Sequence, residues 1–139
     1  MRTHTHWTDL AAADRQASVA MGNFDGVHLG HQAVIKLAAA QGAPLGIVTF
    51  EPHPRQFFAP SAPAFRLMNS EARAHRLAKI GVEQLYEIPF DATLAGMTAE
   101  DFVAEVLVKG LAVANVTVGS DFCFGKGRKG TVATLQDLA

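Results

Sequence analysis

Cysteine is almost absent from this sequence. Cys123 is the only one in 139 residues, so the chain cannot form an internal disulfide, and we expect a reducing compartment. Long apolar runs are missing as well, since none approaches the roughly 20 residues that a membrane-spanning helix needs. The opening stretch, MRTHTHWTDLAAADRQ, lacks the apolar centre of a signal peptide. The sequence therefore predicts a cytoplasmic protein that neither enters a membrane nor is secreted.

An excess of either charge is also lacking. The sequence has 12 Lys and Arg residues against 13 Asp and Glu residues, a formal net charge of −1. Proteins that bind nucleic acid concentrate basic charge, so we expect no nucleic-acid partner, whereas a small phosphorylated ligand needs only local charge. No internal repeat is present, and the 49% apolar and 18% charged residues are typical of one globular domain with its own hydrophobic core.

Apolar strands and amphipathic helices alternate along the chain. Short apolar runs predict buried strands at residues 18–22, 43–50, 82–88 and 113–119. Helical spacing predicts helices at residues 30–41, 69–81 and 98–111, with another beginning at 131. No element is predicted before residue 16. This order predicts an α/β fold, a parallel sheet with helices on both faces.

The ends of the predicted helices carry recognisable signals. Gly42 and Gly81 are placed to end the first two helices. Thr98 and Asp101 resemble a capping box at the start of the third, with Asp in place of Glu or Gln. The predicted buried stripes of the first and third helices are Val34, Leu37 and Ala38, and Phe102, Val103, Val106 and Leu107.

Three unusual loops follow predicted strands. Residues 22–29 are rich in glycine, 51–66 contain four prolines, and 120–130 are rich in glycine and basic residues. Ligands of doubly wound sheets gather at the carboxyl ends of the strands, near the point where the strand order reverses. Because all three loops would open on that edge, we expect them to share one site.

The first loop has the composition of an anion site. Gly22, Gly26 and Gly30 let a ligand approach the main chain closely, and the helix that follows begins with unpaired amide hydrogens and partial positive charge. His28 and His31 flank the start of this helix, three residues apart, so they can face one ligand. Imidazoles donate hydrogen bonds to phosphate oxygens. The residues therefore predict a phosphate site.

Other interpretations of this corner stay open. Two histidines three residues apart can also be metal ligands, although no Cys, Asp or Glu stands at a recognised zinc spacing, or they can be incidental to function. The dinucleotide fingerprint fits worse, because its glycines are spaced differently. The P-loop also fits worse, since GSDFCFGKG has five residues between Gly119 and Gly125 and a glycine after Lys126.

Three motifs in order resemble one family. GNFDGVHLGH contains the HxGH motif of the nucleotidyltransferase superfamily, and with VTFEPHP and VGSDFCFGKGRKG it resembles the FMN adenylyltransferase module of bacterial bifunctional riboflavin kinase/FAD synthetases. The resemblance implies a Rossmann-like three-layer α/β/α nucleotidyltransferase fold with a mainly parallel sheet. It also implies that residues 1–139 form an FMN adenylyltransferase domain.

The reaction implied by this resemblance joins ATP and FMN to give FAD and pyrophosphate. A phosphate oxygen of FMN attacks the α-phosphorus of ATP, with the help of Mg²⁺, and the protein supplies no covalent nucleophile. No residue of this chain is assigned as a metal ligand. His28 and His31 would hold the phosphates of ATP. The other nucleotide-binding residues would be Gly22, Asn23, Phe24, Asp25 and Gly30.

The remaining loops supply the implied flavin pocket. Phe57 and its neighbour Phe58 have the flat apolar surface that would cover a flavin ring, or else they anchor their loop in the core. Lys126 and Arg128 are expected to contact phosphate, or else to lie in a solvated basic loop. The residues that the resemblance assigns to the flavin are His53, Pro54, Phe57, Asp121 and Phe124.

Two features of the family are missing from these residues. They lack a Ser/Thr-rich run that ends in arginine and helps to bind ATP, and they lack the riboflavin kinase module. We therefore expect a domain that is incomplete at its C-terminus and is fused to a riboflavin kinase in a longer chain. Two rival functions are a nucleotidyltransferase with another acceptor, such as a cytidylyltransferase, and a flavin- or nucleotide-binding module without turnover.

Overall fold

A five-stranded parallel sheet forms the centre of the computed structural model, which describes residues 1–22, 29–51, 70–119, 130–131, 133 and 135–136. The strand order is β1-β4-β3-β2-β5. The strands are β1 (Arg2–His4), β2 (Ser18–Met21), β3 (Leu45–Glu51), β4 (Gln84–Pro89) and β5 (Asn115–Val118). The predicted α/β class and parallel sheet are confirmed.

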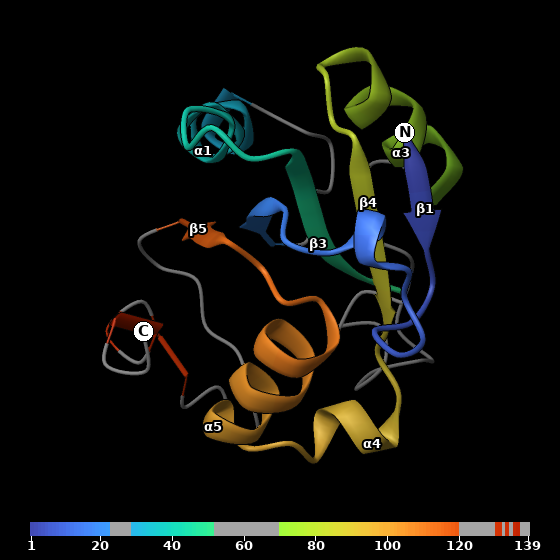
Figure 1. Ribbon diagram of the computed structural model, residues 1–139, viewed down its shortest axis with the longest axis vertical. Helices are drawn as coiled ribbons and strands as arrows, with labels where there is room; N and C mark the ends of the chain where they lie inside the picture. The colour runs from blue at the N-terminus through green and yellow to red at the C-terminus, as the bar shows by residue number, and fades with distance from the viewer. Residues whose placement is uncertain (23–28, 52–69, 120–129, 132, 134, 137–139) are drawn as a thin grey trace, which may run out of the picture.

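Helices cover both faces of the sheet, which gives three layers. Figure 1 shows α1 and α3 above the sheet and α4 and α5 below it. The helices are η1 (Ala12–Asp14), α1 (Leu29–Ala39), α3 (Ser70–Lys79), α4 (Ala92–Ala95), α5 (Ala99–Phe102) and η2 (Val103–Gly110). α5 continues directly into η2, whose turns are wider than α-helical turns: the amide of Leu111 reaches back five residues to the carbonyl of Val106, at 2.8 Å.

The strand order reverses beside β2. This strand pairs with β3 on one side and with β5 on the other, and Met21 lies level with both Val48 and Val118. The chain runs outward from β2 through β3 to β4, and then crosses back to β5. The junction of β2 and β5 is therefore the switch point at which sheets of this kind bind ligands.

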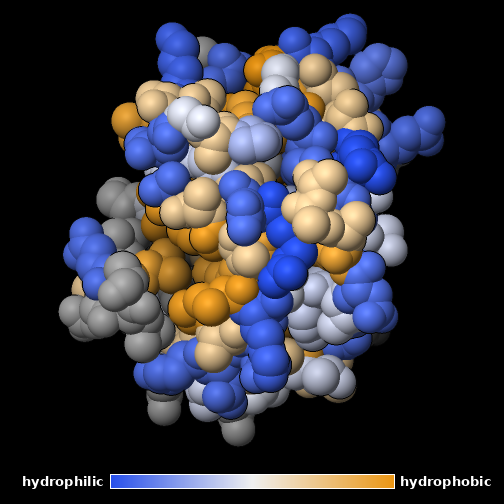
Figure 2. All heavy atoms as spheres, in the orientation of Figure 1, coloured by the Kyte–Doolittle hydropathy of each residue, from blue (hydrophilic) through white to orange (hydrophobic). Residues whose placement is uncertain are grey.

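Each face of the sheet has its own apolar core. Toward α4, α5 and η2 the core includes Val48, Phe50, Ile88, Phe102 and Val106. Toward α1 and α3 it includes Ala20, Ile47 and Leu85 from the strands and Ile35, Ala38 and Leu77 from the helices. Figure 2 shows apolar residues over the region of β5 and α5, between hydrophilic upper and lower rims. The helices are thus held by burial rather than by propensity alone.

The structure corrects several details of the sequence prediction. β1, η1 and α4 were not predicted, and α1 buries Ile35 and Ala38, while Leu37 is 60% exposed. Other expectations are confirmed. Gly42 and Gly81 follow α1 and α3 with φ of 78° and 97°, and the hydroxyl of Thr98 accepts the amide of Asp101 at 3.1 Å.

Candidate functional site

The strands end together at one edge of the sheet. Because the sheet is parallel, β2, β3 and β5 all direct their carboxyl ends there. Gly22 directly follows β2, and its buried amide donates to the carbonyl of Val48 at 3.0 Å. This bond ties the first residue of the glycine-rich loop to the neighbouring strand, so the backbone is held at the end of β2.

Helix α1 begins at the same edge. Its first residue is Leu29, followed by Gly30 and His31. α1 packs against β2, β5 and β3, so the helix lies over the junction of β2 and β5. His31 is half-buried and its Nδ1 atom is shielded from solvent. The N-terminal end of a helix, with its partial positive charge, and an imidazole thus lie together at this edge, which is an arrangement that favours anions.

The face of the sheet under α1 and α3 turns polar as it approaches this edge. Ile47 and Leu85 lie in the apolar core of that face. Side chains alternate along a strand, so the next residues on the same face are Thr49, Glu51 and Glu87. Thr49 is fully buried and Glu87 nearly so. A polar layer therefore lies between the apolar core and the ends of the strands.

A buried arginine reaches this polar layer from α3. Arg73 is only 1% exposed, and its Nη2 atom lies 3.0 Å from Oε2 of Glu51 and 4.0 Å from Oε2 of Glu87. It stands one helical turn before Leu77, on the stripe that α3 turns toward the sheet. One guanidinium thus links α3 to the carboxyl ends of β3 and β4.

A second polar cluster lies around Asp14 and fastens β1 to the sheet. The buried carboxylate of Asp14 pairs with Arg2 at 2.8 Å and accepts from Gln84 at 3.4 Å, while Nε2 of His4 lies 2.7 Å from Oε1 of Gln84. The hydroxyl of Tyr86 donates to the backbone carbonyl of Asp14 at 2.5 Å. Burial, and then the charge of Asp14, raises the pKa of Tyr86 to about 12. The neutral phenol is therefore a structural donor.

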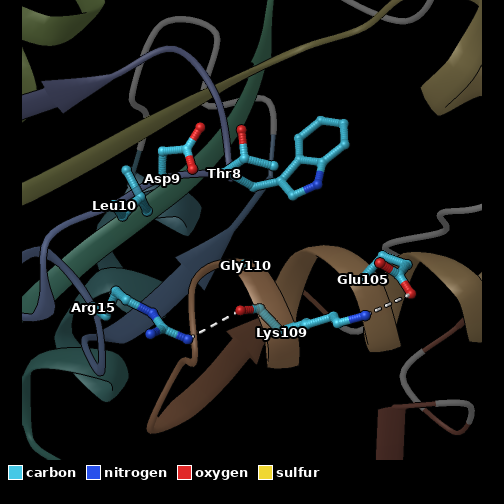
Figure 3. Close-up of a pocket in the computed structure, with 8 residues that line it drawn as sticks. Thr8, Asp9, Leu10, Arg15, Glu105, Lys109 and Gly110 are labelled. Carbon is cyan, nitrogen blue, oxygen red and sulfur yellow. Dashed lines mark hydrogen bonds and ion pairs between the residues drawn. The ribbon is translucent and has the colours of Figure 1, made fainter.

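Two hollows lie among the described residues. One, of about 450 Å³, lies between the segment after β1 and η2; Figure 3 shows Thr8, Asp9 and Leu10 on one side, with Glu105 and Lys109 on the other. Its charges are largely satisfied internally. Arg15 donates to the carbonyl of Lys109 at 3.0 Å, and the ammonium of Lys109 lies 3.9 Å from Glu105.

The second hollow is a groove of similar size between α1 and the end of α3, lined by Gln32, Ile35, Lys36, Leu45 and Ile80 among others. Leu45 begins β3 and Ile80 follows α3, so this groove lies toward the amino ends of the strands. Its other end reaches Gln32, the residue that follows His31 in α1.

Three of the predicted site residues fall within the described part of the chain. The structure brings Gly22, Gly30 and His31 to the switch-point edge, as the strand-to-helix pattern predicts, and their roles stay predictions. Gly30 lies in the first turn of α1. The other predicted site residues lie outside the described residues: Asn23, Phe24, Asp25, His28, His53, Pro54, Phe57, Asp121, Phe124, Lys126 and Arg128.

Sequence reasoning missed the polar layer under α3. The sequence predicts Glu51 as part of a motif and as the first residue of the proline-rich loop, whereas it ends β3, and no role is predicted for Arg73 or Glu87. A signal was present, because a basic residue four positions before Leu77 occupies the buried stripe of a helix. The described residues contain no group of three or more His, Cys, Asp or Glu side chains that could hold a metal ion.

Comparison with known families gives a match over most of the chain. A family model described as FAD synthetase matches residues 10–139. The match begins before β2 and includes every strand except β1. It therefore covers the whole switch-point edge.

Curated relatives share the same description. A bifunctional riboflavin kinase/FMN adenylyltransferase of Escherichia coli K12 is 37% identical over 133 residues, 92% of this chain and 42% of that protein. One from Bacillus subtilis is 35% identical over 141 residues, 97% of this chain and 44% of that protein. The chain thus spans less than half the length of these relatives.

A solved structure shares the fold. A crystal structure described as a macrolide-efflux protein from Streptococcus pneumoniae superposes with a TM-score of 0.79 at 26% identity, over 99% of this chain and 46% of that one. In the part of the chain that the structure describes, no helix is long and apolar enough to span a membrane.

Proposed function

The chain belongs to the FAD synthetase family, and from that premise we propose that it transfers AMP from ATP to FMN, giving FAD and pyrophosphate. The relatives named as FMN adenylyltransferases support this activity. The structural observation that carries the proposal is the corner between the end of β2 and the start of α1, next to the point where the strand order reverses. Main-chain amides, a helix N-terminus and His31 meet there.

The reaction needs alignment and charge stabilisation rather than covalent catalysis. An oxygen of the FMN phosphate forms a bond to the α-phosphorus of ATP, while the bond from that phosphorus to the bridging oxygen breaks, and its electron pair leaves with pyrophosphate. His31, at the start of α1, donates a hydrogen bond to the phosphate oxygens, and His28 shares this role. The amides of the first turn of α1 offset the charge that develops as pyrophosphate leaves.

Mg²⁺ enters this proposal as the counter-ion that ATP carries. No protein ligand is assigned to it, because the described residues hold no suitable cluster of side chains, and no step is routed through it. The proposed flavin contacts are those of the loops after β3 and β5, and Lys126 and Arg128 are proposed to contact phosphate. All of these residues lie outside the described part of the chain.

The relatives' names carry a second activity. Because the chain spans less than half their length, we extend the proposal to a riboflavin kinase module in the same native polypeptide, which would produce the FMN that residues 1–139 consume. The single cysteine of these 139 residues supports the proposal of a reducing, cytoplasmic setting.

His31→Ala tests the proposal in the protein expressed at its native length. We expect turnover of ATP and FMN to fall about 100-fold, because a donor to the transferring phosphates is lost, while the free energy of unfolding changes by less than about 1 kcal/mol. FAD formation is followed by chromatography and unfolding by urea titration. His75→Ala is the matched control, since His75 is exposed on α3 and should leave turnover unchanged.

The same assays separate the rival functions. Pyrophosphate release that requires CTP or an acceptor other than FMN would indicate a different nucleotidyltransferase. Binding of ATP and FMN by calorimetry without pyrophosphate release would indicate a binding module. Normal FAD formation by His31→Ala would remove the role assigned to His31.

A further inference from the structure

The buried ion pair of Arg73 is not explained by stability alone. Taking the guanidinium of Arg73 and the carboxyl group of Glu87 almost wholly out of water carries a large desolvation penalty, and apolar residues of similar volume usually stabilise a core at least as well. Within the same sheet, the opposite face fills the corresponding positions with Phe50 and Ile88. A charged group in the buried stripe of α3 therefore indicates a requirement for a defined geometry at this edge.

The contact holds the last residue of β3. The side chain of Glu51 is 33% exposed, while that of Arg73 is 1% exposed, so the guanidinium lies behind the carboxylate and the carboxylate lies at the edge. The carbonyl of Glu51 also accepts the amide of Phe90 at 3.0 Å, and Glu51 is level with Pro89 of β4. Side chain, main chain and strand register thus fix the same residue.

The position of Glu51 connects this contact to the proposed reaction. In the sequence it directly precedes Pro52, His53 and Pro54, whereas the proposed ATP contacts follow β2, on the neighbouring strand. The end of β3 is therefore the starting point for the residues proposed to meet the flavin. A displacement of this end by about 1 Å is enough to misalign an acceptor severely.

We propose that Arg73 is a positioning residue for the acceptor: by holding the carboxylate of Glu51, it fixes the end of β3 so that FMN is bound in line with ATP. This inference rests on the proposed function. Arg73 does not touch substrate and acts only through Glu51. The residues proposed to bind ATP depend on Arg73 less directly, because β2 and α1 are held by the bond from Gly22 to Val48, three positions before Glu51, and by the packing of α1 on β2, β5 and β3.

Arg73→Met tests this role in the protein of native length, because methionine fills similar space without charge. We expect the KM for FMN to rise about tenfold or more, with the KM for ATP within about twofold of the unmodified value. Quenching of flavin fluorescence measures the Kd for FMN directly, without turnover, and should show the same loss.

Two variants and a control sharpen the test. Glu51→Gln keeps the shape of the side chain but weakens the pair, so it should also weaken FMN binding selectively; it carries the test if Arg73→Met does not fold. Arg73→Lys keeps the charge and should recover FMN affinity to within about threefold. Arg76→Met alters an exposed arginine of the same helix and should change neither substrate constant.

A purely structural role gives a different pattern. A lower melting temperature with unchanged FMN affinity in Arg73→Met and Glu51→Gln would overturn the inference, and so would equal losses of ATP and FMN affinity. Either result leaves the proposed function standing if the unmodified protein makes FAD. An unmodified protein that binds no FMN and forms no FAD would instead refute the proposed function, and the inference with it.

Discussion

The two faces of the sheet differ most where they approach the same edge. Toward α4 and α5 the strands stay apolar to their ends, and the ring of Phe50 contacts those of Phe90 and Phe102, with centroids 6.0 and 6.1 Å apart. Toward α1 and α3 the last positions are polar, and Arg73 joins Glu51 and Glu87. The same strands thus end in an aromatic cluster, formed by Phe50, Phe90 and Phe102, on one face and in a charged layer on the other.

This difference separates stability from function within one sheet. Apolar burial needs only that side chains fill the space, whereas a site that binds phosphates needs donors and charges held in defined directions. The helices that carry His31 and Arg73 both cover the face whose strand ends are polar, and the aromatic cluster lies on the opposite face. We therefore expect substitutions on the two faces to affect different measurements.

Phe102→Ala should have the largest effect on stability. Phe102 is 3% exposed, and removing its ring leaves a cavity beside Phe50, so the free energy of unfolding should fall by about 3 to 5 kcal/mol. Below the melting temperature, the KM values for ATP and FMN should stay within about twofold. Urea titration and steady-state kinetics measure the two quantities.

Phe102→Leu is the control for this variant, because it keeps most of the apolar volume and should lose much less stability. A folded Phe102→Ala protein whose kcat falls as far as that of His31→Ala would contradict the separation of the two faces.

Local patterns made most of the fold predictable. Apolar runs marked β2 to β5 because buried parallel strands are apolar on both faces, and Gly42, Gly81 and Thr98 marked helix ends because their backbone or side-chain chemistry is specific to those positions. β1 could not be predicted. It has three residues, is largely exposed, and is defined by pairing with β4, about eighty positions away.

The same reasoning explains what was predictable of the candidate site. The corner with Gly22, Gly30 and His31 is one continuous stretch, so its strand, loop and helix leave a pattern in the sequence. The contact of Arg73 with Glu51 joins residues 22 positions apart and depends on how α3 lies on the sheet. The prediction that Leu37 is buried was wrong for a related reason. The element that packs on a helix decides which side of its apolar stripe is buried.

Tyr86 is a polar residue in the core toward α4 and α5, and its ionisation tests the hydrogen bond that it donates to Asp14. It is the only tyrosine in the sequence, so phenolate absorbance reports its ionisation alone. Burial raises the pKa of Tyr86 to about 12 in the folded protein, against an ordinary value of 10.0, so the unfolded chain loses the proton first as the pH rises. Stability is unaffected below about pH 10 and should decline between pH 10 and 12, by roughly 2 to 3 kcal/mol in total.

Tyr86→Phe supplies the reference for this measurement, since subtracting its stability profile removes the contribution of lysines that titrate in the same range. The difference should show the decline, and FMN affinity at neutral pH should be unchanged. Titration of Tyr86 near pH 10 in the folded protein would indicate a solvated phenol and would contradict the donor role toward Asp14.

Thr98→Ala should have the smallest effect on stability, and it tests the start of α5, which packs on the face with the aromatic cluster. The hydroxyl of Thr98 accepts the amide of Asp101 at the start of α5, and losing this cap should cost about 1 kcal/mol of unfolding free energy. Thr98→Ser keeps the oxygen and should recover most of this loss. Because α5 packs on the face opposite α1 and α3, neither variant should change kcat or either KM. A changed KM for FMN in Thr98→Ala, reversed in Thr98→Ser, would mean that the helix start is coupled through β3 to the polar edge, so that the two faces act as one unit.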